Sequence, residues 1–421
     1  MACLAISAGQ AFDGRSTVRD PVTIIVRDGV IEAFGATAAV RIPPDAQVLD
    51  FPDATLLPGL IDAHLHLSRD GEPDYMSVML RETPQLQALK AYAYARKTLL
   101  AGYTTVRTAG EKARVDIALK QAVSRGLVDG PRIHAVGKVL GVTGGHRDGY
   151  FSPEVQYEGN SAIVNGADSV RAAVREELKM GADWIKLIVT GGMVSPTEPE
   201  LQQMADDEII AATTEASRLR KRTAAHAHGA QGIRAAVAGG VTSIEHGTFL
   251  DEETAELMIQ RGAYLVPTLA ATKNLVDRGP EMGVAKFAVE KARRSWDEHQ
   301  RSFQLALRVG VQIAAGSDAG GTCCFHGDNV TELELMVSLG MKPKEALVAA
   351  TSVAAELLGV ERMVGRLAAG FIGDLVVVHG DPTSDVQQLR QMKCVVRDGR
   401  IVYPAGEHGL PSKRTPKEAR A

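Results

Sequence analysis

Two histidines separated by one residue, His64 and His66, close an apolar run, LPGLIDAHLHL, near the start of the chain. Alternate residues of a β-strand face the same side, so both imidazoles would point in one direction at the end of the strand. Neutral imidazole is a common ligand of divalent metals. A strand whose exposed end merely has polar side chains is the commoner explanation of such a pair. The pair alone therefore indicates a metal site only weakly.

Further polar residues stand at the ends of other strand-like runs. They are Lys186 in DWIKLIVTGG, His226 and His228 in AAHAHG, His246 in SIEHG and Asp318 in AGSDAGG. Singly, each has an ordinary explanation: a lysine that points to solvent, an interior histidine, or an aspartate that caps a turn. They could form a metal site together only if the fold brings these strand ends close to one another.

The middle of the chain predicts that position, because strand-like and helix-like runs alternate there. Eight strand-like runs are separated by helical stretches expected at residues 83–100, 114–125, 168–180, 206–220, 229–239, 251–261 and around 282–309, with more helix at 330–340 and 343–358. Eight βα units in about 300 residues favour an α/β fold, the (β/α)8 TIM barrel. The carboxyl ends of its strands meet at one mouth, where the polar residues would converge.

Both chain ends differ from the middle. Residues 1–55 and those from about 366 onward contain short strand patterns with Asp-Gly turns, such as DLVVVHG and KCVVRDGRIVY. We therefore expect a composite β-sandwich domain from residues 1–57 and 366–421, and the barrel over residues 58–365.

Composition limits the classes of function. The 421 residues have a formal net charge of −4, which argues against nucleic-acid binding. No apolar run is long enough to span a membrane. Four cysteines make no disulfide framework, and MACLAISAGQAFDG is a poor signal peptide, so we expect a cytoplasmic protein unless a leader was trimmed. The adjacent Cys323 and Cys324 do not match zinc-ligand spacing and stay outside the predicted site.

The quoted motifs, together with HGDNVTELELMVSLGMKPKEALVAATSVAAELLG and GRLAAGFIGDLVVVHGDP, resemble the amidohydrolase superfamily, in the branch with two metals and a carboxylated lysine. The resemblance covers essentially the whole chain. It implies that His64 and His66 bind one divalent metal, that His226 and His246 bind the second, and that carboxylated Lys186 bridges the two. It implies that Asp318 contacts the first metal and shuttles the proton. Zinc suits these ligands.

The segment after the third strand, GVTGGHRDGYFSPEVQYEGNSAIVNGADS, is long and rich in glycine. Long loops in compact domains are often functional. TGGH resembles a motif of prolidase-like and ochratoxinase-like relatives, which release a C-terminal amino acid from an amide. His146, Arg147 and Tyr150 are candidates for holding a substrate carboxylate or oxyanion. His228 is a candidate for contacting the substrate or supporting the ligands, with a structural role as the alternative. An arginine suits a carboxylate, and a solvated ion pair of Arg147 with Asp148 is the alternative.

The predicted function is metal-dependent hydrolysis, by activated hydroxide, of the amide bond in an N-acyl amino acid or dipeptide. Ochratoxin A, which would release phenylalanine, is a possible substrate by resemblance. An imidazolonepropionase-like enzyme that opens a cyclic amide with one metal is an alternative, and a non-catalytic scaffold is a weaker one. The resemblance also implies a homo-oligomer. His134 is predicted to be structural, and His299, in the charged segment DEHQR, to be solvated.

Overall fold

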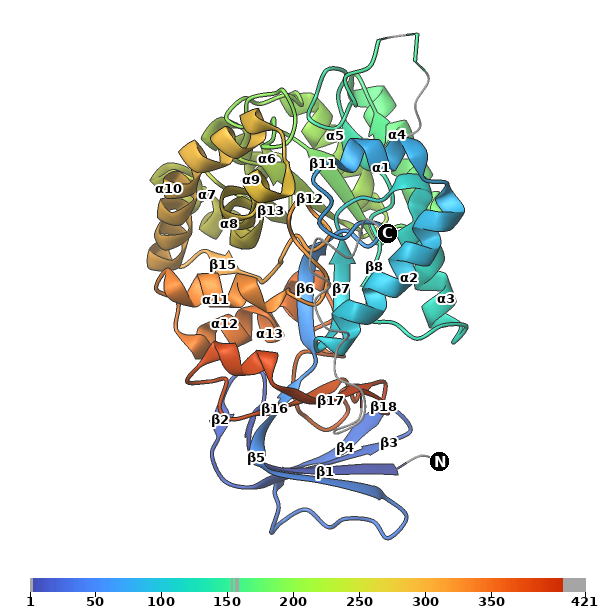
Figure 1. Ribbon diagram of the computed structural model, residues 1–421, viewed down its shortest axis with the longest axis vertical. Coiled ribbons are helices and arrows are strands. Elements are labelled where there is room, and N and C mark those ends of the chain that lie inside the picture. Colours follow the sequence, from blue (N-terminus) through green and yellow to red (C-terminus); the bar gives the residue numbers. More distant parts are fainter. Residues whose placement is uncertain (1–2, 153, 156–158, 404–421) are drawn as a thin grey trace.

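The computed structural model describes residues 3–152, 154–155 and 159–403. Figure 1 shows a barrel surrounded by helices, with a strand-rich layer at one end that contains both the first and the last strands of the chain. No helix among the described residues is long and apolar enough to cross a bilayer.

Eight parallel strands form the barrel, as the sequence predicts. They are β6 (Leu60–Leu65), β7 (Tyr103–Thr108), β8 (Arg132–His134), β11 (Trp184–Ile188), β12 (Arg222–Ala227), β13 (Ser243–His246), β14 (Tyr264–Val266) and β15 (Gln312–Ile313). Between β8 and β11 the ring is joined by a hydrogen bond from Asp183 N to Ala135 O. It closes through a parallel bridge from Leu65 to Ala319. The carboxyl ends of all eight strands therefore meet at one mouth.

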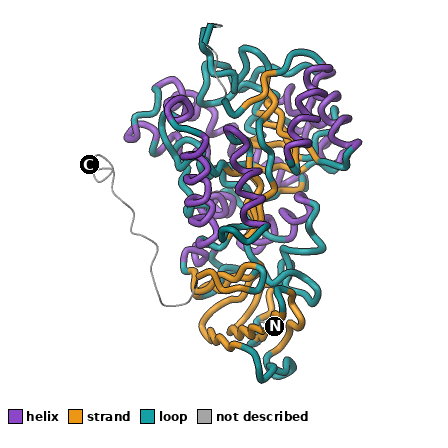
Figure 2. The backbone as a smooth tube through the Cα atoms, turned by 90° about the vertical axis from the view of Figure 1, so that its right-hand side faces the viewer, coloured by secondary structure: helices purple, strands orange, loops and turns teal. Residues whose placement is uncertain are grey.

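Helices cover the outside of the barrel, where Figure 2 shows them in purple around the orange strands. Most match the expected ranges: α2 (Pro84–Leu100), α3 (Val115–Ser124), α4 (Ala167–Met180), α5 (Asp206–Arg218), α6 (Ala230–Ala238), α7 (Glu252–Arg261), α10 (Lys286–Val309) and α11 (Val330–Ser338). The helix expected at 343–358 is two helices, α12 (Pro343–Ala349) and α13 (Ser352–Leu358). Three short helices were not expected: α1 (Tyr75–Arg81), α8 (Leu269–Asp277) and α9 (Gly279–Met282).

The long third loop is partly strand. Its β9 (Val139–Gly141) pairs in parallel with β10 (Ser161–Ile163), and β9 also pairs with β11. This pairing fixes the start and end of the loop beside the barrel wall. His146 and Arg147, which lie between the two strands in sequence, are thereby placed at the mouth.

The strand-rich layer confirms the composite β domain. Its sheet has the order β18-β17-β16-β5-β1-β3-β4, with β2 on β1. The strands are β1 (Cys3–Phe12), β2 (Thr17–Val18), β3 (Val22–Arg27), β4 (Val30–Ala36), β5 (Gln47–Pro58), β16 (Leu375–His379), β17 (Met392–Arg397) and β18 (Arg400–Tyr403). The two chain ends join where Leu56 of β5 pairs with Val377 of β16. The exact divisions at 57/58 and 365/366 stay predictions, and residues 404–421 lie outside the described residues.

Candidate metal centre

The predicted ligands converge on one cavity at the mouth. Its lining contains all six, with two arginines, two further histidines and an apolar wall: His64, His66, Arg69, Ala109, His146, Arg147, Lys186, Ile188, Met193, Val194, His226, His228, His246, Ala271, Thr272, Leu275, Asp318, Gly321 and Thr322. The six come from five strands or the residues just beyond them. Their convergence is a consequence of the barrel and not of closeness in sequence.

One cluster consists of His64, His66 and Asp318, with one ligand atom of each within 4.8 Å of the others. Asp318 Oδ1 lies 3.2 Å from His66 Nε2 and 3.5 Å from His64 Nε2. Burial by itself raises the pKa of Asp318, but His66, His64 and Arg69 outweigh it and lower the pKa to about 2. Asp318 adopts a φ of 54°, a strained conformation that tends to occur at functional sites.

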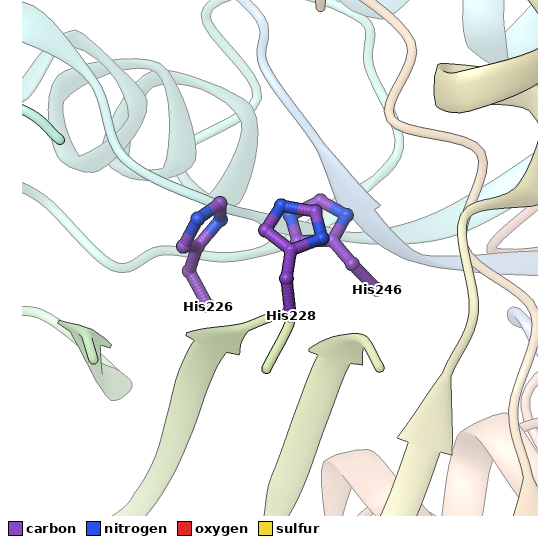
Figure 3. Close-up of side chains that lie close together, drawn as sticks. All are labelled: His226, His228 and His246. Atoms are coloured by element: carbon purple, nitrogen blue, oxygen red, sulfur yellow. The ribbon is translucent and has the colours of Figure 1, made fainter. Parts of the chain in front are cut away.

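The second cluster consists of His226, His228 and His246, whose ligand atoms also lie within 4.8 Å of one another. Figure 3 shows the three imidazoles grouped above the ends of β12 and β13. His246 Nδ1 donates to Thr268 Oγ1 at 2.6 Å, since that hydroxyl itself donates to Pro267 O. His246 Nε2 therefore keeps its lone pair for a ligand. His228, predicted for substrate contact, belongs to this cluster by position.

Burial favours the neutral form, which metal binding requires, of His66, His226, His228 and His246. Burial lowers the pKa of His66 and of His228 to about 3. It lowers the pKa of His226 and His246 well below the usual value. Neutral imidazoles at pH 7 can bind a cation without first losing a proton.

Lys186 lies on β11 with its side chain buried in the same cavity. Its Nζ has no hydrogen-bond partner, and the nearest carboxylate oxygen, Glu245 Oε2, is 3.9 Å away. Burial lowers the pKa of Lys186 to about 7, although Glu245 acts in the opposite direction. A buried neutral amine can react as a nucleophile, which is what carboxylation of a lysine requires.

These residues fit two divalent cations. Each cluster offers nitrogen or carboxylate ligands suited to such metals, and Asp318 Oδ1, like Lys186 Nζ, is buried without a hydrogen-bond partner. Unpaired buried polar atoms are costly, so both atoms are poised for a partner that the chain does not supply. The arrangement gives two histidine-rich sites consistent with a binuclear centre.

A buried ion-pair network supports the first cluster and was not predicted from the sequence. His64 Nδ1 donates to Glu245 Oε2 at 2.6 Å, which leaves His64 Nε2 facing Asp318. Arg107 donates to the other oxygen of Glu245 at 2.7 Å and its guanidinium stacks on Trp184 at 4.5 Å. Glu245 stood in the quoted SIEHG motif beside His246. Only the three-dimensional pairing shows that it orients His64, as carboxylates commonly do for metal-binding histidines.

The candidate substrate residues have different environments. His146 is buried, contacts Ser195 Oγ through Nδ1 at 2.7 Å and stacks on His226 with ring centres 4.6 Å apart. Arg147 lines the cavity and makes no ion pair with Asp148, whose carboxylate instead accepts from Gly144 N at 2.7 Å. Tyr150 is 41% exposed, its hydroxyl donates to Gly145 O, and it is not among the lining residues.

Two interior residues hold the loops that follow β11 and β13. The ammonium of Lys291, from α10, donates to the carbonyls of Ser195 and Thr197, which fixes the loop after β11. His299 was predicted to be solvated, and that prediction is wrong. It is fully buried, donates from Nε2 to the carbonyls of His246 and Pro267, and contacts Thr272 through Nδ1. The charged neighbours that suggested exposure lie on the outer face of the same helix.

His134, predicted to be structural, lies at the end of β8 and is not among the lining residues. Burial lowers its pKa to about 4.

The barrel, the appended β domain and the paired histidine clusters together define a metal-dependent hydrolase. The chain belongs to the amidohydrolase family, whose sequence model matches residues 55–402. It is accordingly a hydrolase that acts on carbon–nitrogen bonds.

Three known proteins are similar to this chain over more than nine tenths of its length. Ochratoxinase of Aspergillus niger is 30% identical over 415 residues, which cover 93% of this chain and 84% of that protein. A solved Xaa-Pro dipeptidase with bound methionine in its active site is 34% identical, with a TM-score of 0.89 over 96% of this chain and all of the other. A solved prolidase complexed with N-methylphosphonate-L-proline is 32% identical, with a TM-score of 0.87 and the same coverage.

Proposed function

We propose that the chain hydrolyses the amide bond of an N-acyl amino acid or a dipeptide and releases a free amino acid. The observation that supports this most directly is the unpartnered amine of Lys186, buried in one cavity with both histidine clusters. The similarity to an ochratoxinase and to two dipeptide-cleaving enzymes supports the same class of substrate.

In this proposal His64 and His66 hold the first metal, His226 and His246 hold the second, and carboxylated Lys186 bridges them. Zinc suits the ligands. When bound, the two cations would polarise the substrate carbonyl and lower the pKa of water, so that hydroxide is available at neutral pH. His228, whose ring lies in the second cluster, has a place either as a further ligand or against the substrate.

Asp318 is the proposed proton shuttle. Its low pKa keeps it ionised, so it can accept the proton of the attacking water. The carbon–oxygen bond forms, the carbon–nitrogen bond breaks, and Asp318 returns the proton to the departing nitrogen. The products are the carboxylic acid of the acyl group and the free amine of the amino acid. His146, Arg147 and Tyr150 are the proposed substrate contacts.

A product-identified screen tests the proposal. Protein of measured metal content is incubated with N-acyl amino acids, dipeptides and ochratoxin A, and release of the free amino acid is followed by mass spectrometry. Release from at least one group is expected, and from ochratoxin A the expected product is phenylalanine. Absence of turnover across the whole library would refute the substrate class.

The same experiment distinguishes the proposed reaction from the imidazolonepropionase-like alternative. An imidazolonepropionase-like enzyme would open a cyclic amide and hold about one metal ion per chain. A one-metal enzyme of this kind does not need a bridging lysine, so the buried, unpaired Lys186 would have no function in it. We therefore favour the two-metal reaction. Turnover of cyclic amides alone, at one metal per chain, would reverse this preference.

A further inference from the structure

Arg69 lies three residues beyond His66 and was not recognised as functional in the sequence, where it stands in a polar Ser-Arg-Asp run. Its side chain is buried, with 2% of the residue exposed, and it lines the cavity of the metal centre. Its Nε and Nη2 are buried without any hydrogen-bond partner. A guanidinium cannot lose its charge at neutral pH, so these donors need an anion from elsewhere.

A second arginine is in the same situation. Arg147 lines the same cavity, and its Nη1 is also buried without a partner. Both guanidiniums lie 5.3 Å from the ring centre of Tyr75. Among the described residues neither arginine has a carboxylate within ion-pair distance. Two guanidiniums that line one cavity and have unpaired donors are suited to binding an anion.

We propose that Arg69 and Arg147 together bind the carboxylate of the leaving amino acid, and that this two-arginine site restricts the enzyme to amides with a free carboxylate next to the scissile nitrogen. The proposal rests on the proposed function and goes beyond it by naming which group is recognised and by which residues.

The position of Arg69 agrees with this geometry. Arg69 and Asp318 line the same cavity, and Asp318 is the group proposed to protonate the leaving nitrogen. In an amino acid only the Cα atom separates that nitrogen from the carboxylate carbon. A group that binds the carboxylate must therefore share a cavity with the proton donor, as Arg69 does.

The remaining wall of the cavity indicates where the acyl group would lie. Ala271 and Leu275 are on α8, which follows β14, the seventh strand of the barrel. Arg147 is in the loop after β8, the third strand. In a ring of eight strands the third and the seventh are opposite each other, so Ala271 and Leu275 face Arg147 across the cavity. An uncharged acyl group suits that wall.

Binding measurements test the proposal without turnover. L-Phenylalanine and L-phenylalaninamide, which differ in the carboxylate, are titrated calorimetrically into the metal-loaded protein. We expect the wild type to bind the acid about ten- to a hundredfold more tightly than the amide, the range for a charged hydrogen-bonded pair. Arg69→Met and Arg147→Met should each remove most of that preference, and Arg69→Lys should restore part of it.

Arg132→Met is the matched control, because it removes an arginine that already has aspartate partners at the other end of the barrel. It should leave the preference intact. Wild-type protein without a preference, or arginine variants that keep it or weaken both ligands equally, would overturn the proposal. If Arg69→Met does not fold, Arg147→Met and Arg69→Lys decide the question.

The two proposals fail separately. Loss of the preference in the variants, together with no turnover of any N-acyl amino acid by the wild type, would support the arginine site and refute the reaction. Turnover that is equally fast for the acid and the amide forms of one substrate would support the reaction and refute the arginine site.

Discussion

The arginines at the two ends of the barrel differ in what neutralises them. At the end next to the β domain, Arg132 donates to Asp398 at 2.8 Å and lies 3.6 Å from the buried Asp374. At the mouth, Arg69 and Arg147 have no carboxylate within ion-pair distance among the described residues. The chain thus supplies its own anions where the two domains join. At the mouth it leaves guanidinium nitrogens of both arginines without a hydrogen-bond partner, and we propose that the substrate pairs them.

The largest expected effect comes from removing the central amine at the mouth. Lys186→Met should reduce the bound metal below two per chain and bring activity close to background, because the proposed bridging ligand is lost. The metal-free variant should be at least as stable as metal-free wild type, since an unpaired buried amine is replaced by an apolar chain. Elemental analysis, turnover and thermal melts are the measurements. Undiminished metal and activity would show that Lys186 bridges nothing.

Asp318→Asn should have the next largest effect, with kcat lowered about 10²–10⁴-fold, the usual contribution of a positioned general base. KM should change little because the carbonyl and carboxylate contacts remain. Steady-state kinetics with metal content measured in parallel check this. A rise in KM at constant kcat would assign Asp318 to binding and not to proton transfer.

Glu245→Gln tests whether the hydrogen bond from His64 to Glu245 supports metal binding by the first cluster. Metal affinity should fall about 10–100-fold, as is typical when the partner of a metal-binding histidine is altered. Stability should also fall, because Arg107 would keep a buried charge without its carboxylate. Metal titration and denaturant unfolding report the two effects separately. Unchanged metal affinity with lowered stability would give Glu245 a purely structural role.

The smallest effects are in stability and bear directly on the two kinds of arginine. Arg132→Met should destabilise the protein by about 0.5–1 kcal/mol, the value of a partly exposed ion pair. Arg69→Met should be neutral or stabilising in the absence of substrate, since it removes a buried charge with no partner. Denaturant unfolding compares them. Equal losses in both variants would mean that Arg69 has a structural counter-ion after all.

The eight strands could be predicted from the apolar runs, and the six candidate ligands from polar residues in or just after those runs together with the resemblance to the family. The same rule could not find Arg69, which lies beyond the strand in a run of polar residues that resembles an ordinary turn. It misplaced His299 because the exposed face of a helix dominates the composition of a short segment. Glu245 faces the barrel interior from the middle of β13, and its pairing with His64 spans 181 positions of sequence. Such pairings are set by the curvature of the barrel and leave no local pattern.

The union of both chain ends in one sheet has a consequence for synthesis of the protein. β5 ends at Pro58 and its partner β16 begins at Leu375, so 374 − 58 = 316 residues must be made between them. At ribosomal rates that interval lasts roughly 15–60 s. During that time one edge of β5 is an unpaired strand edge, of the kind that invites association with other chains. A growing chain would therefore need protection of its first strands until nearly all of the barrel has emerged.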